Sequence, residues 1–189
     1  METTPTHTST LTYMGNKRKL VGYIDNVIDH VIEKLNKPTI TFADPFSGSG
    51  VVSKHAFTSS KCSHVIANDI AGYSHLINHY NLLPLRSTEL QERLCSIIDM
   101  ANSLPPPKPS DEWFAKHWAP KDDTNIQTGE RCYFTRENAL IIDAIRNFID
   151  TSAVPDKFRP YLLSLLVVQA SIHNNTNGQF AAYYKDEDG

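Results

Sequence analysis

The chain has 189 residues, of which 40% are hydrophobic and 21% charged, and its formal net charge at pH 7 is −3. This composition predicts a globular protein of one domain, or of one domain with an insertion, and it lacks the global basic character of a typical DNA binder. Three widely spaced cysteines fit neither a disulfide framework nor a zinc site, and no leader-like or membrane-length apolar run is found, so we expect a cytoplasmic protein without membrane contact.

A cationic segment comes before the first expected helix. Lys17, Arg18 and Lys19 precede residues 20–35, in which apolar side chains recur at helical spacing until Pro38 stops the pattern. Cations are disfavoured at the positive end of a helix dipole. This segment is therefore either a solvated helix start or a sign that an anionic group lies nearby.

A short strand then leads into a glycine-rich turn. Residues 39–43 read as a strand, and the sequence Asp44-Pro45-Phe46-Ser47-Gly48-Ser49-Gly50 follows before an expected helix over 51–59. A strand, a glycine turn and a helix start let backbone N–H groups approach a nucleotide-like ligand closely. The alternative is that both glycines are ordinary turn residues of an α/β domain.

A second strand favours the ligand-binding interpretation. Residues 64–68 read as this strand, and Asp69 follows at 19 residues beyond Gly50. That separation is close to the spacing of about 20 residues at which a second-strand carboxylate meets ribose hydroxyls. An adenosine-type cofactor is expected, although Asp69 is also a suitable strand-end cap. The missing third glycine argues against a dehydrogenase.

The organisation of the chain changes near residue 84. Helices are expected over 72–81, 89–104, 136–150 and 160–172, with an extended proline-rich segment after the second of them. Thr135 is suited to be the N-cap of the third. The fourth is almost continuously apolar and is expected to be buried. A further strand is expected near 179–184.

Two groups of side chains in this second part each have two interpretations. Aromatic residues either pack the inserted part, which we favour, or stack on exposed bases: Trp113, Phe114, Trp118 and Tyr133. Arginines either pair with nearby acids, the commoner use of such alternation, or contact phosphates: Arg131, Arg136, Arg146 and Arg159, with Glu130, Glu137, Asp143 and Asp150 as the acids. The histidines show no pattern of metal ligands, so no metal site is expected.

These motifs, in this order, resemble the adenine-specific DNA methyltransferases of restriction–modification systems whose cofactor motifs come first and whose catalytic motif comes last. The resemblance is carried by Tyr13-x-Gly15-Asn16-Lys17, by the turn from Asp44 to Gly50, and by Asn68-Asp69. It continues through Arg131 to Arg146 and through Asn174 to Lys185, so it covers residues 11–185. The chain resembles the N-terminal portion of such an enzyme.

The resemblance implies an incomplete Rossmann-like fold of the S-adenosylmethionine-dependent methyltransferases, with a mostly helical insertion. It implies a disordered segment over 1–10, a cofactor-binding α/β part over 11–84, a target-recognition region over 85–178, and the start of a return to the catalytic part over 179–189. Residues implied to bind S-adenosyl-L-methionine are Tyr13, Lys17, Asp44, Phe46, Gly48, Gly50 and Asp69. By this analogy Tyr13 and Lys17 flank its methionine end, Asp44 and Phe46 hold the turn, the glycines admit the cofactor, and Asp69 binds the ribose hydroxyls.

One element of the family is absent from the sequence. The tetrapeptide Asp-Pro-Pro-Tyr, which in this family follows a later strand and carries catalysis, does not occur, and Pro105-Pro106-Pro107 has no strand before it. No catalytic residue is therefore assigned. The resemblance implies N6-adenine methylation of double-stranded DNA with a flipped base, completed by a second polypeptide or by a C-terminal part that the chain lacks. The chain alone is expected to be inactive.

Two other functions remain open. The chain is alternatively a non-catalytic subunit of a split methyltransferase, which binds cofactor or DNA only. A nucleotide-dependent oxidoreductase is the second alternative, and the turn with two glycines, Gly48 and Gly50, disfavours it.

Overall fold

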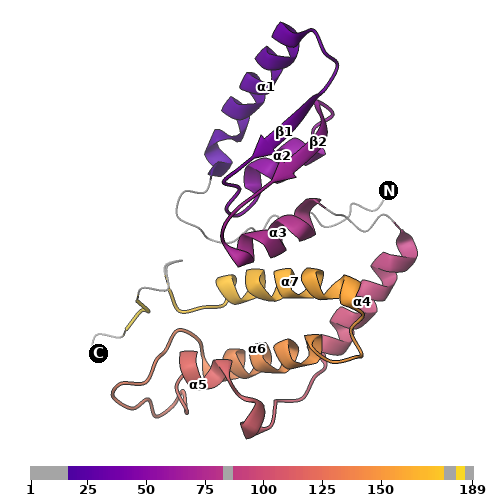
Figure 1. Ribbon diagram of the computed structural model, residues 1–189. Helices are drawn as coiled ribbons and strands as arrows, with labels where there is room; N and C mark the ends of the chain where they lie inside the picture. Colours follow the sequence, from indigo (N-terminus) through magenta and orange to yellow (C-terminus); the bar gives the residue numbers. More distant parts are fainter. Residues whose placement is uncertain (1–16, 83–86, 177–181, 186–189) are drawn as a thin grey trace, which may run out of the picture.

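The computed structural model describes residues 17–82, 87–176 and 182–185 (Figure 1). Its first part alternates helices and strands: η1 (Lys17–Leu20), α1 (Val21–Leu35), β1 (Ile40–Asp44), α2 (Val51–Thr58), β2 (Cys62–Ala67) and α3 (Gly72–Leu82). The expected helices and both expected strands of this part are confirmed, with ends that differ by up to two residues.

The two strands form a small parallel sheet. Phe42 pairs with Val65, and Asp44 pairs with Ala67. The connection between them runs through α2, which packs on both strands, as parallel strands require a crossover. The carboxyl ends of both strands therefore lie at the same edge of the sheet. Asp44 is the last residue of β1, and Asp69 lies two residues beyond the end of β2. The strand expected near 179–184 is not seen in residues 182–185, and residues 179–181 lie outside the described residues.

The second part is helical. It contains α4 (Thr88–Asn102), η2 (Pro109–Asp111), α5 (Phe114–Trp118), α6 (Arg136–Ile149), η3 (Asp156–Phe158) and α7 (Arg159–Ile172). A buried cluster joins α4, α6 and α7: Ile97, Ile149, Val154, Phe158 and Leu162. Among the described residues, no helix has the length and apolar character needed to cross a membrane. The expected boundary at residue 84 lies in the gap between the described segments.

Helix α7 connects the two parts of the structure. It packs on α6 on one side and on α3 on the other (Figure 1). Tyr161 near its start contacts His79 and Tyr80 of α3 edge-on, with ring centroids 5.3 and 6.1 Å apart. The helix expected over 160–172 is confirmed, but its expected burial is only partly correct: Tyr161, Leu162 and Ser164 are buried. Most of its other side chains are only partly buried, and Ile172 is 47% exposed.

The aromatic side chains of the second part mostly pack against one another. Phe114 meets Phe134 edge-on, and Trp118 meets Tyr133 in the same way. These rings surround a second cluster that includes Ala115 and is separate from the first. The packing interpretation is therefore confirmed for Phe114, Trp118 and Tyr133. The exposed Trp113 instead lies against the ring of His117.

The expected pairing of arginines with nearby acids is confirmed for one of the named acids, Asp150, whereas Arg136 and Arg159 pair with acids outside the expected set, Glu112 and Asp156. Arg146 pairs with Asp150 one turn later, and Thr135 caps the helix by accepting from the N–H of Asn138. Asp143 has a different role. It is 3% exposed and accepts hydrogen bonds from the backbone N–H groups of residues 113, 114 and 115, at 3.1, 2.7 and 2.8 Å. Its carboxylate therefore caps α5 because the two helices are packed together.

Replacing this cap should be costly. Asp143→Ala leaves three N–H groups, one buried and two partly buried, without their acceptor, so we expect the free energy of unfolding to fall by about 2–4 kcal/mol. Asp150→Ala is the matched control, since its carboxylate is exposed and its ion pair contributes at most about 0.5 kcal/mol. Urea unfolding of both variants measures the difference. Equal losses would contradict the capping role.

Candidate functional site

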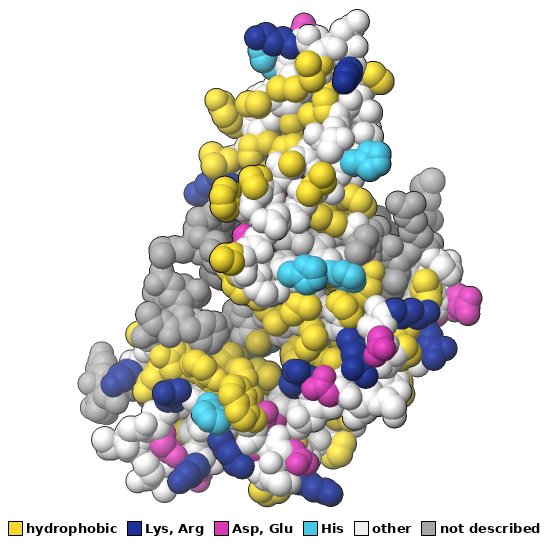
Figure 2. All heavy atoms as spheres, viewed as in Figure 1, with side chains coloured by type: hydrophobic (Ala, Val, Ile, Leu, Met, Phe, Trp, Pro, Cys, Tyr) yellow, Lys and Arg dark blue, Asp and Glu magenta, His cyan; other side chains and the backbone are white. Residues whose placement is uncertain are grey.

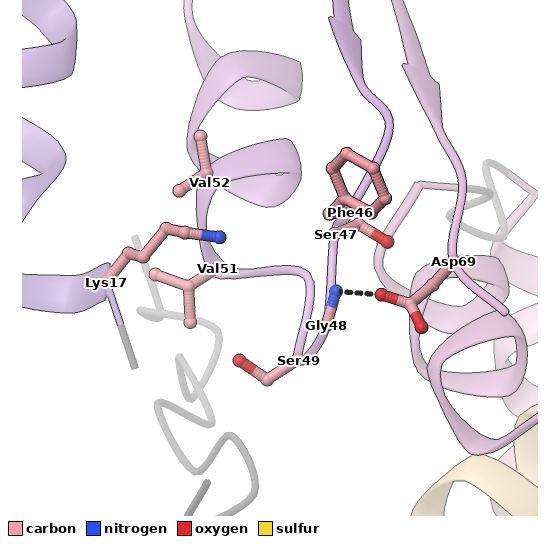
Figure 3. A pocket seen from close by; sticks show the side chains of 8 residues that line it. All are labelled: Lys17, Phe46, Ser47, Gly48, Ser49, Val51, Val52 and Asp69. Atoms are coloured by element: carbon pink, nitrogen blue, oxygen red, sulfur yellow. Dashed lines mark hydrogen bonds between the residues drawn. The ribbon is translucent and has the colours of Figure 1, made fainter. Parts of the chain in front are cut away.

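A pocket of about 300 Å³ opens at the carboxyl ends of the two strands (Figure 3). This is the edge at which parallel α/β sheets bind ligands. It is lined by Lys17, Phe46, Ser47, Gly48, Ser49, Val51, Val52 and Asp69. Four residues selected from the sequence thus meet in one pocket: Lys17, Phe46, Gly48 and Asp69. Tyr13 lies outside the described residues.

The glycine turn has a backbone that other residues adopt with difficulty. Gly48 has φ of 52° and Gly50 has φ of 71°, both in the left-handed region. Gly50 then serves as the residue before α2, and its carbonyl accepts from the N–H of Lys54. A β-carbon at residue 50 would lie 2.5 Å from the side-chain oxygen of Asn78. The sequence therefore needs glycine here for both conformation and space.

Asp69 is tied to this turn by its carboxylate. Its Oδ2 accepts from the N–H of Gly48 at 2.7 Å, and its Oδ1 accepts from the N–H of Ala71 at 3.0 Å. These hydrogen bonds, that of Ala71 foremost, hold the pKa of Asp69 below its ordinary value, and the positive charge of Lys17 adds to the effect. The carboxylate is thus kept ionised at the pocket wall. It caps the turn beyond the strand and also lines the pocket. The strand-end interpretation is therefore confirmed, and the binding of ribose hydroxyls stays a prediction.

Two of the residues selected from the sequence, Asp44 and Gly50, contact the helices next to the turn rather than the pocket. Asp44 accepts a hydrogen bond from the hydroxyl of Ser53 at 3.0 Å, which ties the end of β1 to the first turn of α2. Gly50 faces Asn78 of α3. Neither residue belongs to the pocket lining. Phe46 is 78% exposed, so its ring forms a rim of the pocket rather than part of the core.

Sequence reasoning missed a network that holds the turn in place. The amide of the buried Asn78 donates to Ser47 Oγ at 2.8 Å and to the carbonyl of Ser74 at 2.8 Å. Ser47 in turn donates through Oγ and through its N–H to the carbonyl of Asn68, at 3.0 and 2.9 Å. Helix α3, the turn and the end of β2 are therefore joined through one amide side chain. No local pattern around Asn78 distinguishes it from a solvated helix residue.

We expect Asn78→Ala to loosen the turn. Loss of the buried amide leaves Ser47 with one fewer partner, and the free energy of unfolding should fall by about 1–3 kcal/mol. The ¹⁵N–¹H resonance of Gly48 should shift as well, because Ser47 and Asn68 flank its contact with Asp69. His75→Ala, on an exposed position of the same helix, is the control. An unchanged Gly48 resonance in the Asn78 variant would show that the network does not position the turn.

The described residues contain no group of three or more His, Cys, Asp or Glu side chains that would hold a metal ion. His75 and His79 share a face of α3, with ring centroids 6.4 Å apart. Burial lowers the pKa of His79, and the neighbouring His75 adds to this. His79 packs against Tyr161, so its role in the described structure is structural.

Known proteins similar to this chain are DNA methyltransferases. The type II methyltransferase M.NlaIII of Neisseria lactamica is 29% identical over 185 residues, which cover 93% of this chain and 50% of that protein. M.CviAII of Paramecium bursaria Chlorella virus 1 is 28% identical and covered to 49%, and the modification methylase LlaI of Lactococcus lactis is 28% identical and covered to 27%. The chain thus spans half or less of the length of these relatives. No solved structure is significantly similar to it.

The sequence profile of one family matches nearly the whole chain. The match runs over residues 13–188 and therefore includes the turn, Asp69 and all of the helical part. The chain belongs to the D12 class of N6 adenine-specific DNA methyltransferases.

Proposed function

We propose that the pocket binds S-adenosylmethionine and that the chain is the cofactor-binding and target-recognition portion of an N6-adenine DNA methyltransferase. The observation that carries this proposal is the hydrogen bond from the N–H of Gly48 to the carboxylate of Asp69. A positive-φ glycine turn and an ionised carboxylate meet in one pocket, in a chain of a methyltransferase family. When bound, the cofactor would supply the methyl group for transfer, which is carried by its sulfonium sulfur.

The side chains around the pocket fit the chemical groups of this cofactor. The ammonium of Lys17 suits the carboxylate of its methionine end, and Tyr13 is proposed to flank the same end. Asp69 offers acceptor oxygens for ribose hydroxyls, as a second-strand acid does in nucleotide sites. Ile70 follows it with a fully exposed apolar side chain, which the purine would cover. The open space before Gly48 admits the ligand close to the backbone.

The catalytic step needs residues that this chain does not carry. The reacting nitrogen of adenine is held in the base pair, so the base must leave the stack. Its lone pair is delocalised into the ring, and a positioned pocket must supply acceptors for its hydrogens. The tetrapeptide Asp-Pro-Pro-Tyr is absent from the sequence. We infer that a further polypeptide segment completes the Rossmann-like sheet and supplies this pocket, in the cytoplasm where the DNA lies.

Residues 11–84 are proposed as the cofactor part, and 85–178 as the part that reads double-stranded DNA. A non-catalytic subunit that binds cofactor or DNA is the second candidate, and the missing tetrapeptide favours it. The two candidates differ in whether methyl transfer is restored by the completing segment.

Isothermal titration of the chain separately with S-adenosylmethionine, S-adenosylhomocysteine and NAD⁺ tests the ligand. We expect saturable binding of the first two and none of NAD⁺, because the turn lacks the third glycine of the dinucleotide fingerprint. Binding of NAD⁺ alone would favour an oxidoreductase.

A further inference from the structure

A row of three aromatic rings, with a cation at each end, joins α5, the loop after it and the segment 182–185. The guanidinium of Arg131 lies over Trp118, 5.4 Å from the ring centroid. Trp118 meets Tyr133 edge-on at 5.3 Å, and Tyr133 meets Tyr183 edge-on at 4.9 Å. The ammonium of Lys185 lies 6.0 Å from the centroid of the Tyr183 ring. We call these five residues the ladder.

Hydrogen bonds between distant segments hold the ladder together. The N–H of Asn175 donates to the carbonyl of Tyr133 at 2.7 Å, and the N–H of Tyr184 donates to the carbonyl of Asn175 at 3.1 Å. The hydroxyl of Tyr183 donates to the carbonyl of Glu130 at 3.1 Å. Segment 182–185 is thereby held against the loop 119–135 and makes its described contacts with the helical part.

Both cations of the ladder are exposed, and each is oriented by a ring. The guanidinium of Arg131 also donates through Nη1 to the carbonyl of His117 at 3.3 Å. Neither cation forms an ion pair with a carboxylate of the described residues, whereas Arg146 does. A ring attracts a cation without neutralising its charge. Both charges therefore stay available to an anion.

The acids of the loop 119–135 are engaged by backbone N–H groups instead. Asp122 accepts from the N–H of residue 124 at 2.8 Å, and Asp123 accepts from the N–H of residue 136 at 2.9 Å. Glu130 accepts from the N–H of residue 127 at 2.9 Å. In Figure 2, Lys and Arg side chains, with Asp and Glu among them, lie over the lower left of the molecule, where Figure 1 places α5 and this loop.

The chemistry of this surface suits a phosphate. Its exposed ends are charged, so it calls for water or an anion rather than for apolar cover. The planar N–H groups of an arginine match phosphate oxygens, and a lysine adds a point charge. The rings of Trp118 and Tyr133 are partly buried and meet edge-on, so they position cations rather than offer their faces to bases. In a family of DNA methyltransferases, the phosphates are those of the DNA backbone.

We propose that Arg131 and Lys185 bind backbone phosphates of the target DNA, and that the three rings hold these cations in place. Contacts of this kind set the position and orientation of a protein on DNA but read no bases. The inference rests on the proposed function, since it names the surface through which the helical part meets its DNA. It also adds the segment 182–185 to residues 85–178 as part of that surface.

The salt dependence of DNA binding, measured without cofactor, tests the inference. Fluorescence anisotropy gives the affinity of the chain for two labelled duplexes of unrelated sequence between about 50 and 200 mM salt. Arg131→Gln combined with Lys185→Gln should weaken binding of both duplexes by roughly 10- to 100-fold at the lowest salt. The slope of log affinity against log salt should become shallower by about two, because each phosphate contact releases about one counterion.

Arg93→Gln combined with Lys157→Gln is the matched control. It removes the same two charges from exposed side chains in α4 and η3, outside the ladder. Lys157 also lies over a ring, that of Phe158 at 5.1 Å, so the control includes the loss of one such contact. Affinity and slope should stay nearly unchanged. Melting temperatures of all variants detect any loss of folding.

A conservative variant separates a phosphate contact from a structural role. Arg131→Lys, with Lys185 intact, keeps the charge but loses the planar guanidinium. We expect it to retain the salt slope of the original chain, whereas Arg131→Gln alone should reduce that slope by about one. Equal slopes for the two Arg131 variants would contradict a phosphate contact at this residue.

Four further results would overturn the inference. The first is DNA binding whose slope is unchanged in the double variant, which would leave DNA as the target and move the contact elsewhere. The second is an equal loss in the matched control. The third is a loss with only one of the two duplexes, which would indicate contacts to bases. The fourth is no DNA binding by the chain, which would also remove residues 85–178 as the part that reads DNA, while the cofactor titration stands separately.

Discussion

Gly48→Leu should abolish measurable binding of S-adenosylmethionine. The left-handed backbone at this glycine costs another residue about 1–2 kcal/mol, and the new side chain would stand in the pocket beside Asp69. Gly22→Leu is the control, because a β-carbon at Gly22 meets nothing within 4 Å. Calorimetry gives the affinity, and thermal melting of each variant separates lost binding from lost folding. Gly48→Ala repeats the test with a smaller side chain.

Asp69→Ala should weaken the same affinity by roughly 10- to 100-fold, the range expected for charge-assisted hydrogen bonds. It also removes the acceptor of Gly48 N–H, so the turn loses its tie to β2. Asp156→Ala, at an exposed carboxylate in η3, should leave the affinity unchanged. Unchanged affinity in both the Gly48 and the Asp69 variants would show that S-adenosylmethionine does not bind in this pocket.

The purified chain should transfer no methyl group to DNA by itself. Its sequence lacks the tetrapeptide that would hold adenine, and positioning by such a pocket supplies much of the rate of a transfer reaction. Incorporation of tritiated methyl groups into DNA, compared with a heat-inactivated sample, measures this. Adding a segment that carries the later strands should restore transfer. Incorporation by the chain alone would show that another segment of it carries the catalytic motif.

The strand, turn and helix of the pocket were predictable because their signals are local. Glycines at 48 and 50 mark positive φ, and an acid at or shortly beyond the end of each strand marks its carboxyl end. The hydroxyl of Thr135 likewise signals a helix start, and the structure places it there. In each of these cases the neighbours in sequence are also the neighbours in space.

Other features depend on packing between distant segments, which single-sequence patterns do not encode. Asp143 looks like an exposed partner for an arginine, but it caps a helix 28 to 30 residues earlier. Asn78 looks like a solvated helix residue, but it contacts the turn 31 residues away. For α1 the periodicity predicts an apolar face, but it does not tell which part of that face the rest of the chain covers.

Helix α3 belongs to both halves of the molecule. One of its faces holds Ser47 through Asn78, and another carries His79 and Tyr80 against Tyr161 of α7. Closely packed interiors transmit displacement rather than absorb it. A ligand that moves α7 by engaging the helical half therefore also moves the amide that fixes the glycine turn. Suppose that a ligand on the helical half changes the affinity of the turn for its own ligand by a given factor. By thermodynamic reciprocity, a ligand bound at the turn then changes the affinity of the helical half for the first ligand by the same factor.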